Sequence, residues 1–142
     1  MPIKNYTTEI ESFRSIGEIQ GALASHGVSQ IMIDYADGCP VGISFALQTA
    51  RGFFGFKLPA NIEGVRRAFE KERVRATAGQ AERTAWRNVR DWVLAQMAIV
   101  DAGMVETEEV FFPYIVDKCG TTVFDAFQQG RLLVGAEAES TT

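Results

Sequence analysis

Three arginines, Arg83, Arg87 and Arg90, recur at the i, i+4, i+7 spacing that places residues on one face of a helix. Guanidinium groups in a row are suited to bidentate contacts with phosphate oxygens. Trp86 borders this arginine stripe, close enough in sequence to stack with Arg90. The same stripe could instead pair with acidic residues in the C-terminal third of the chain. The sequence leaves both interpretations open.

The Lys and Arg residues of the whole chain are unevenly distributed. Residues 57–90 hold nine of the 14 Lys and Arg residues and four acidic residues, which gives this band a net charge of +5, while the rest of the chain carries −9. A basic band inside an acidic protein indicates an anionic partner. Besides the arginine stripe, we expect Lys57, Arg73 and Arg75 to contact such a partner.

Residues 53–58 are predicted to form a strand whose alternation separates two faces. Phe54, Phe56 and Leu58 share the face expected in the core. The opposite face would present an aromatic ring between two cations, with a glycine leaving room for a flat ligand, which is the chemistry of a base-stacking platform. A helix packed over this face is the competing interpretation. The platform residues are Arg51, Phe53, Gly55 and Lys57.

Signatures of catalysis are scarce. The single histidine, His26, excludes a two-histidine metal site, and any histidine-dependent triad would have to use it. His26 precedes Gly27, a helix-stop residue, and an imidazole there interacts favourably with the helix dipole. No glycine-rich phosphate loop occurs. We therefore expect a protein that is not an enzyme and uses neither a metal nor a cofactor.

Size and composition predict a single globular domain over residues 1–135, followed by a disordered polar tail over residues 136–142. The longest apolar runs are far shorter than a membrane span, and the N-terminal residues are polar. A soluble, cytoplasmic protein without membrane contact is expected. Its two isolated cysteines, Cys39 and Cys119, are expected to be free thiols.

The elements that position these residues follow from periodicity and from capping signals. Ser15 and Glu18 fit a capping box, and the first helix is expected to run from about Phe13 or Ile16 to about His26. Strands over residues 29–35, 41–47 and 53–58 alternate and are joined by turns, and a short strand within residues 3–10 could precede them. Helices follow over residues 61–71, 80–102, 107–113 and 121–129, the third of which is interrupted by Pro113.

The expected fold is therefore α+β: an N-terminal helix, a three-stranded antiparallel meander, then three to four helices around a long central helix. After Asp91 the long helix is apolar nearly all round. This pattern predicts that its second half, with Trp92, Val93, Met97 and Val100, is the buried centre of the protein.

Six segments of the chain carry a family resemblance. They are 2–9 (PIKNYTTE), 16–23 (IGEIQGAL), 80–87 (QAERTAWR), 91–98 (DWVLAQMA), 109–114 (EVFFPY) and 120–124 (GTTVF). These segments resemble a family of small proteins encoded by phages and prophages of Gram-positive bacteria. The resemblance covers nearly the whole chain and implies an accessory role in the cytoplasm of the host. It implies no catalytic residues.

Two classes of function remain. The first is a binder of a phosphate-bearing ligand, either single-stranded nucleic acid or a small signalling nucleotide that is sequestered to counter host immunity. In this hypothesis Arg73, Arg75 and the arginine stripe contact phosphates, and Phe53 or Trp86 supplies a stacking surface. The second is a protein-interaction module that inhibits or recruits a host factor. A homo-oligomer is compatible with either class, with the aromatic segment 111–114 as a candidate interface.

Overall fold

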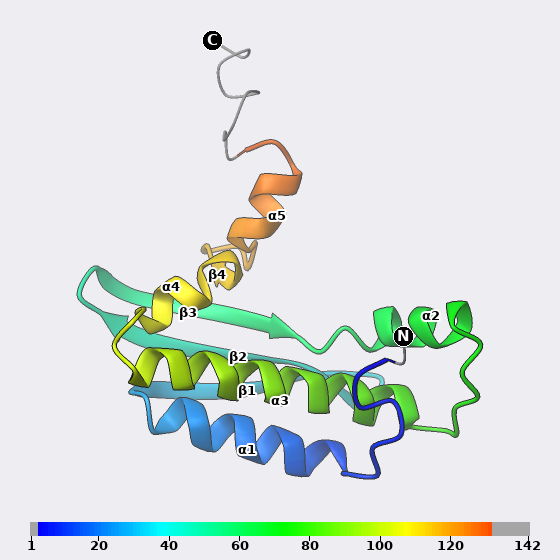
Figure 1. Ribbon diagram of the computed structural model, residues 1–142. Coiled ribbons are helices and arrows are strands. Elements are labelled where there is room, and N and C mark those ends of the chain that lie inside the picture. Colours follow the sequence, from blue (N-terminus) through cyan, green and yellow to red (C-terminus); the bar gives the residue numbers. More distant parts are fainter. Residues whose placement is uncertain (1–2, 132–142) are drawn as a thin grey trace.

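The computed structural model describes residues 3–131 and confirms the expected α+β class (Figure 1). The expected tail, residues 136–142, lies outside the described residues. An N-terminal helix is followed by an antiparallel meander and then by helices that include a long one of 22 residues. In chain order the elements are α1 (Ser12–Ala24), β1 (Val28–Ala36), β2 (Cys39–Thr49), β3 (Gly52–Pro59), α2 (Ile62–Lys71), α3 (Gln80–Asp101), α4 (Thr107–Val110), the 3-10 helix η1 (Phe112–Tyr114), β4 (Ile115–Val116) and α5 (Val123–Gln128).

The sheet has the order β1-β2-β3-β4, and all neighbouring strands are antiparallel. Asp37 and Gly38 connect β1 to β2, and both have a positive φ, 51° and 78°. Two consecutive residues with positive φ form the turn that matches the twist of a tight hairpin. The register places Met32, Ser44 and Lys57 side by side across β1, β2 and β3.

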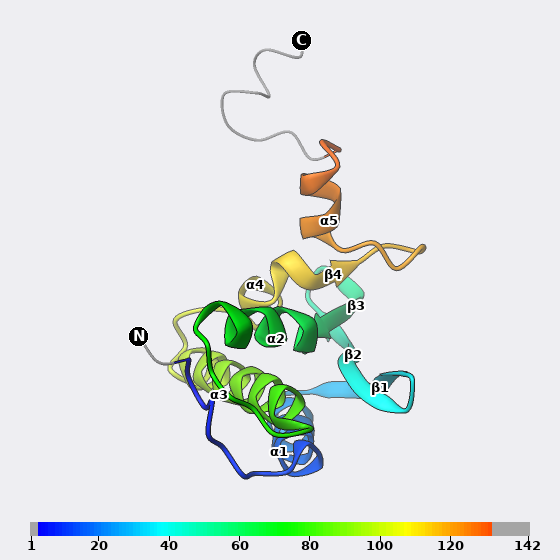
Figure 2. The same cartoon turned by 90° about the vertical axis from the view of Figure 1, so that its right-hand side faces the viewer.

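The hydrophobic core lies between one face of the sheet and the helices α1 and α3. Both helices cover the same side of the sheet (Figure 2). Phe45 of β2 and Phe56 of β3 stack at a centroid distance of 4.9 Å, and Phe111 packs edge-on against both rings. The alternation predicted for β3 is confirmed, because Phe56 and Leu58 are buried and Phe53 and Lys57 are exposed.

Two local expectations are wrong. Helix α1 begins at Ser12, next to the earlier of the two expected starts, and Ser15 does not cap it because Ser15 is buried inside the helix. In α3, Val93 and Met97 are buried as expected, but Trp92 and Val100 are only half-buried. Burial follows one face along the whole helix, with Ala81, Thr84, Ala85 and Trp86 in the first half, instead of being concentrated in the second half. Ala95, Ala98 and Ile99 are exposed apolar residues that the amphipathic packing leaves on the outer face.

The C-terminal third is more broken than predicted. The helix from Thr107 ends at Val110, and Pro113 lies in the following 3-10 helix η1, where its missing N–H costs little. The two residues of β4 then pair with Gly55 and Phe56 of β3. Helix α5 follows β4 and projects away from the rest of the molecule (Figure 1). Residues 3–10 contain turns and no strand, so a strand preceding α1 is absent from the described chain.

Candidate functional site

The side chains of the arginine stripe form hydrogen bonds with other residues of the chain. Arg87 Nη1 donates to Glu18 Oε2 of α1 at 2.9 Å, and Arg90 Nε donates to the same oxygen at 2.7 Å. The two side chains are only 14% and 27% exposed. The Arg90 hydrogen bond, with the charge of Arg87 beside it, lowers the pKa of Glu18. These arginines therefore tie α3 to α1, and not to the C-terminal acids that the sequence suggested as partners.

Arg83, the first member of the stripe, is also engaged within the molecule. Its Nη2 donates to Gln80 Oε1 at 2.8 Å, one turn earlier on α3. Trp86 is fully buried, and its Nε1 donates to the carbonyl oxygen of Pro40 at 3.0 Å. A ring in this position has no face free for a ligand, so the expectation that Trp86 supplies a stacking surface is wrong. Trp86 is buried because it lies on the side of α3 that packs against the sheet, next to the arginine stripe.

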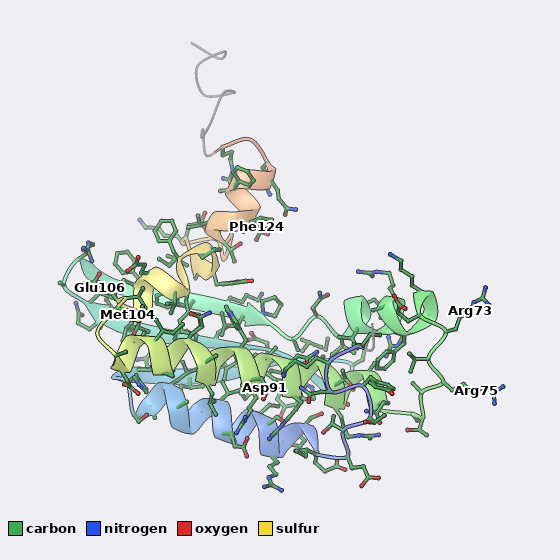
Figure 3. All side chains as sticks on the ribbon, in the orientation of Figure 1. Arg73, Arg75, Asp91, Met104, Glu106 and Phe124 are labelled. Atoms are coloured by element: carbon green, nitrogen blue, oxygen red, sulfur yellow. The ribbon has the colours of Figure 1, made fainter. Side chains whose placement is uncertain are left out.

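The other predicted contact residues lie in separate places. Arg51, in the turn between β2 and β3, donates to Glu106 at 3.0 Å and lies within 3.4 Å of Glu108. Arg73 and Arg75 are exposed in the connection between α2 and α3, and Figure 3 shows both pointing away from the body of the protein. The structure thus does not assemble the nine predicted residues into one basic surface.

A hollow of about 900 Å³ lies between the β1–β2 turn, α2 and the start of α3. Its lining includes one cation, Arg66, which pairs with Glu63 on the same helix. Carboxylates outnumber this cation, so the hollow repels a phosphate group. The acidic residues in its lining are Asp37, Glu63, Glu70 and Glu82.

The sheet face opposite α1 and α3 is the remaining candidate. We call it the open face. Phe53 and Met32 are 56% and 62% exposed on it, so a helix packed over Phe53, the competing interpretation, is absent from the described chain. The register defines its members, which are Gln30, Met32 and Asp34 of β1, Ser44, Ala46 and Gln48 of β2, Phe53, Gly55 and Lys57 of β3, and Val116 of β4.

A shallow hollow of about 400 Å³ occupies the middle of the open face. Its floor is the cross-strand pair Ala46 and Gly55, which carry the smallest side chains of the face. A Cβ built on Gly55 would lie 3.2 Å from Val116 Cγ2, so a larger residue would narrow the hollow. Met32 and Lys57 line its sides. The arrangement can accept an apolar group beside one positive charge.

Ser25, His26 and Asp101 come together in a way the sequence did not predict. His26 Nε2 lies 2.7 Å from Asp101 Oδ1, and Nδ1 lies 3.1 Å from Ser25 Oγ. However, Nδ1 also lies 2.6 Å from the carbonyl oxygen of Ala22, to which Ser25 Oγ donates at 2.9 Å. A carbonyl can only accept, so Nδ1 carries a proton and cannot take one from Ser25. The cluster closes the end of α1, as expected for His26, and does not activate a nucleophile.

Sequence reasoning missed two residues that shape these surfaces. Glu18 was assigned to a cap, although it binds two arginines 69 and 72 positions away. Met32 lies between Gln30 and Asp34 on the exposed side of β1, where an apolar residue interrupts a polar alternation. That interruption was a usable signal for an exposed apolar surface.

Comparison with protein-family models, with curated proteins and with solved structures returned no match to this chain. The resemblance to small phage proteins therefore stays an expectation. Within residues 3–131, no cluster of His, Cys, Asp or Glu could hold a metal ion, and no helix is long and apolar enough to cross a bilayer. Cys39 and Cys119 are exposed free thiols, as expected.

Proposed function

We propose that this protein is a non-enzymatic interaction module that binds another protein through its open face. The observation that carries the proposal is the pair of exposed apolar side chains, Met32 and Phe53, beside a hollow floored by Ala46 and Gly55. Exposed apolar groups around a recess mark a surface that gains free energy when a partner covers it. This is the second of the two function classes that the sequence left open.

The distribution of charge favours a protein over a nucleic acid. Phosphate contacts supply most of the affinity of a nucleic-acid-binding protein, and each contact needs a cation. The open face carries one cation, Lys57, and one carboxylate, Asp34, which accepts a hydrogen bond from Ser44 at 2.9 Å. A single strand could stack on Phe53 there, but few of its phosphates would be neutralised.

The chemistry of the face defines the partner group it accepts. The recess fits an aliphatic or aromatic side chain, and Lys57 at its side favours a carboxylate next to that group. In the setting implied by the resemblance, the partner is a protein of the bacterial host or of the phage. Binding would then inhibit or recruit this factor, without any bond being made or broken.

The proposal is tested by affinity capture from nuclease-treated lysate of a Gram-positive host, followed by titration of the purified partner. One variant combines Phe53→Ser with Ala46→Lys, which removes the ring and fills the recess. The matched control is Arg75→Gln, an exposed cation outside the open face. We expect wild type and control to bind the partner with equal affinity and the double variant to lose at least tenfold.

Two results would reject the proposal. Equal binding by the double variant would remove the open face from the interaction. Retention from untreated lysate that is absent from the nuclease-treated lysate, together with direct binding of a labelled oligonucleotide that needs Phe53, would assign the face to nucleic acid instead.

A further inference from the structure

Strand β1 is the long exposed edge of the sheet. It has nine residues and only one neighbouring strand, β2, whereas the opposite edge is the two-residue β4. The backbone N–H and C=O groups on its outer side therefore have no strand partner within residues 3–131. Such an edge is a ready template for another strand.

Only the two ends of β1 carry features that discourage pairing. Proteins usually protect exposed edges with lysine, proline, bulges or inward charges. Here the register is irregular only at the ends, between Val28 and Gln30 and between Asp34 and Tyr35. The regular stretch between these irregularities, residues 30–34, contains no lysine, arginine or proline, and Asp34 is its single charge.

Helix α1 shows a second unexplained feature near this edge. Its side-chain hydrogen bonds with α3 are made by Ser15 and Glu18. Four residues at the spacing i, i+4, i+7 and i+11 form a stripe on a different side of the helix. The stripe is largely exposed, and it contains one aromatic residue and two small residues. The stripe consists of Phe13, Gly17, Gln20 and Ala24, with Gly21 beside it.

The two glycines of α1 have no structural reason within one copy of the chain. A glycine inside a helix is less stable than alanine, because the unfolded chain gains freedom. Neither Gly17 nor Gly21 has a positive φ, and a Cβ built on either would meet nothing within 4 Å. A glycine in such a position allows the backbone of a second chain to approach closely.

We propose that two copies of this chain associate through β1, antiparallel about a two-fold axis at Met32, so that their four-stranded sheets join into one. This association uses the backbone edge of β1 and does not rest on the partner binding proposed above, although Met32 belongs to both surfaces. The partner of the exposed edge is a second copy of the chain, because two antiparallel copies of the edge are complementary to each other.

The register centred on Met32 satisfies the side chains on both faces. Ile31 of one copy lies opposite Ile33 of the other, on the core side of the joined sheet. Gln30 lies opposite Asp34, where the amide can donate to the carboxylate. No like charges face each other, since Asp34 is the only charge of the stretch.

Pairing of the strands also explains the small residues of α1. Paired strands lie about 4.8 Å apart, whereas helices usually pack with their axes about 8 to 10 Å apart. Helices carried by adjacent strands must therefore approach closely. Met32 is four residues, about 13 Å, into β1, and the same distance back along α1 spans about nine helical residues. Counted back from Ala24, the last residue of α1, nine residues reach Ile16, next to Gly17. Gly17 therefore lies near the level of the axis, and Phe13 of one copy lies near Gly21 of the other.

The association is tested by sedimentation equilibrium and by cysteine crosslinking of the full chain. Wild type is expected at twice the 15.6 kDa mass of one chain. In a Cys39→Ser, Cys119→Ser background, Met32→Cys should form a disulfide-linked dimer, because opposed residues of antiparallel strands have Cα atoms about 4.5 to 5.5 Å apart. Gln48→Cys, exposed on the same face but in the inner strand β2, is the matched control and should stay monomeric on a non-reducing gel.

Two variants separate association from folding. Met32→Lys places like charges opposite each other at the axis, and Gly17→Leu fills the space between the helices. Both are expected to raise the dissociation constant at least tenfold while the far-ultraviolet circular dichroism is retained, since both positions are exposed.

A monomeric wild type throughout a dilution series, or crosslinking of Met32→Cys no faster than of Gln48→Cys, would overturn the proposal. Unchanged association of Gly17→Leu would remove α1 from the interface and with it the proposed packing.

Discussion

Arg87 donates to Glu18 across the contact between α3 and α1, with 2.9 Å between Arg87 Nη1 and Glu18 Oε2. Arg90 binds the same carboxylate oxygen, so one acid holds two cations of the arginine stripe. A guanidinium that is 14% exposed and already paired would have to break this pairing before it could reach a phosphate. Two of the nine cations of the basic band therefore hold α3 against α1.

Replacement of Glu18 by Gln should destabilise the protein. The substitution leaves Arg87 and Arg90 partly buried without their shared acceptor, and we expect the free energy of unfolding to fall by about 1 to 3 kcal/mol. Urea denaturation followed by circular dichroism measures the change. Glu9→Gln, an exposed acid with no ion pair among the described residues, is the control and should leave the midpoint unchanged. Equal effects of both variants would contradict a structural role for the Glu18 cluster.

Acid should weaken the same contact. Hydrogen bonding by Arg90 lowers the pKa of Glu18 from its usual value of 4.5, and hydrogen bonds from Asn5 and Arg90 outweigh burial to lower that of Asp91 from 3.8. A carboxyl whose pKa is lower in the folded state contributes stability above its unfolded pKa, and this stability is lost as the pH falls through the folded value. The free energy of unfolding should therefore decrease below about pH 4.5. Glu18→Gln should make this decrease shallower, and identical pH profiles for both proteins would contradict the assignment.

The fold was predictable where the signal is local. Strand β3 has a period of two over Phe53 to Lys57, and this alternation is set by backbone geometry alone. Helix α3 has caps and periodicity over 22 residues, long enough for the pattern to identify it. The two residues of β4 carry no such pattern, because their pairing with Gly55 and Phe56 depends on where the preceding 3-10 helix directs the chain.

The candidate site was less predictable because its chemistry depends on distant partners. The spacing of the arginine stripe correctly placed its members on one side of a helix. It could not reveal that Glu18 lies opposite, since no local rule pairs residues about 70 positions apart. The exposure of Phe53 depends likewise on which face of the sheet α1 and α3 cover, and alternation defines two faces without saying which one is covered.

His26 should make stability depend on pH in the opposite direction. The carbonyl oxygen of Ala22 and the carboxylate of Asp101 outweigh burial and raise the pKa of His26 above its usual 6.5. A histidine whose pKa is higher in the folded state contributes stability below its unfolded pKa, and this is lost as the pH rises through the folded value. Because Asp101 is 67% exposed, solvent screens the pair and we expect a loss of only about 0.5 kcal/mol.

Thermal unfolding of wild type and His26→Gln at about pH 6 and about pH 9 measures this contribution. The wild type should lose more stability than the variant between the two values. Asp101→Asn keeps the imidazole but removes the charge, so it should show an intermediate loss. A variant profile that parallels the wild type would show that His26 does not titrate in this range.

The two tryptophans of α3 should differ in their contribution to stability. Trp86 is fully buried and donates to Pro40, whereas Trp92 is half-buried and packs edge-on against Phe111 and Tyr114. We expect Trp86→Ala to cost about 3 to 5 kcal/mol and Trp92→Ala about 2 to 3 kcal/mol. Urea midpoints of the two variants decide the order. A larger loss for Trp92 would restore the expectation that the second half of α3 is the centre of the core.

The arginine stripe provides the sharpest contrast between structural and ligand-binding roles. Replacement of Arg83, Arg87 and Arg90 by Gln should lower the free energy of unfolding by several kcal/mol, about 1 to 2 kcal/mol for each charged hydrogen bond removed. Any weak binding of a labelled single-stranded oligonucleotide should keep its salt dependence, because these side chains reach no phosphate.

Replacement of the exposed Lys57, Arg73 and Arg75 should have the opposite effects. It should leave stability unchanged and flatten the plot of log affinity against log salt by about 0.7 for each phosphate that is no longer neutralised. Fluorescence titrations of both triple variants across a salt series measure this. A folded stripe variant whose slope flattens by about two units would return the arginines to the role of phosphate ligands.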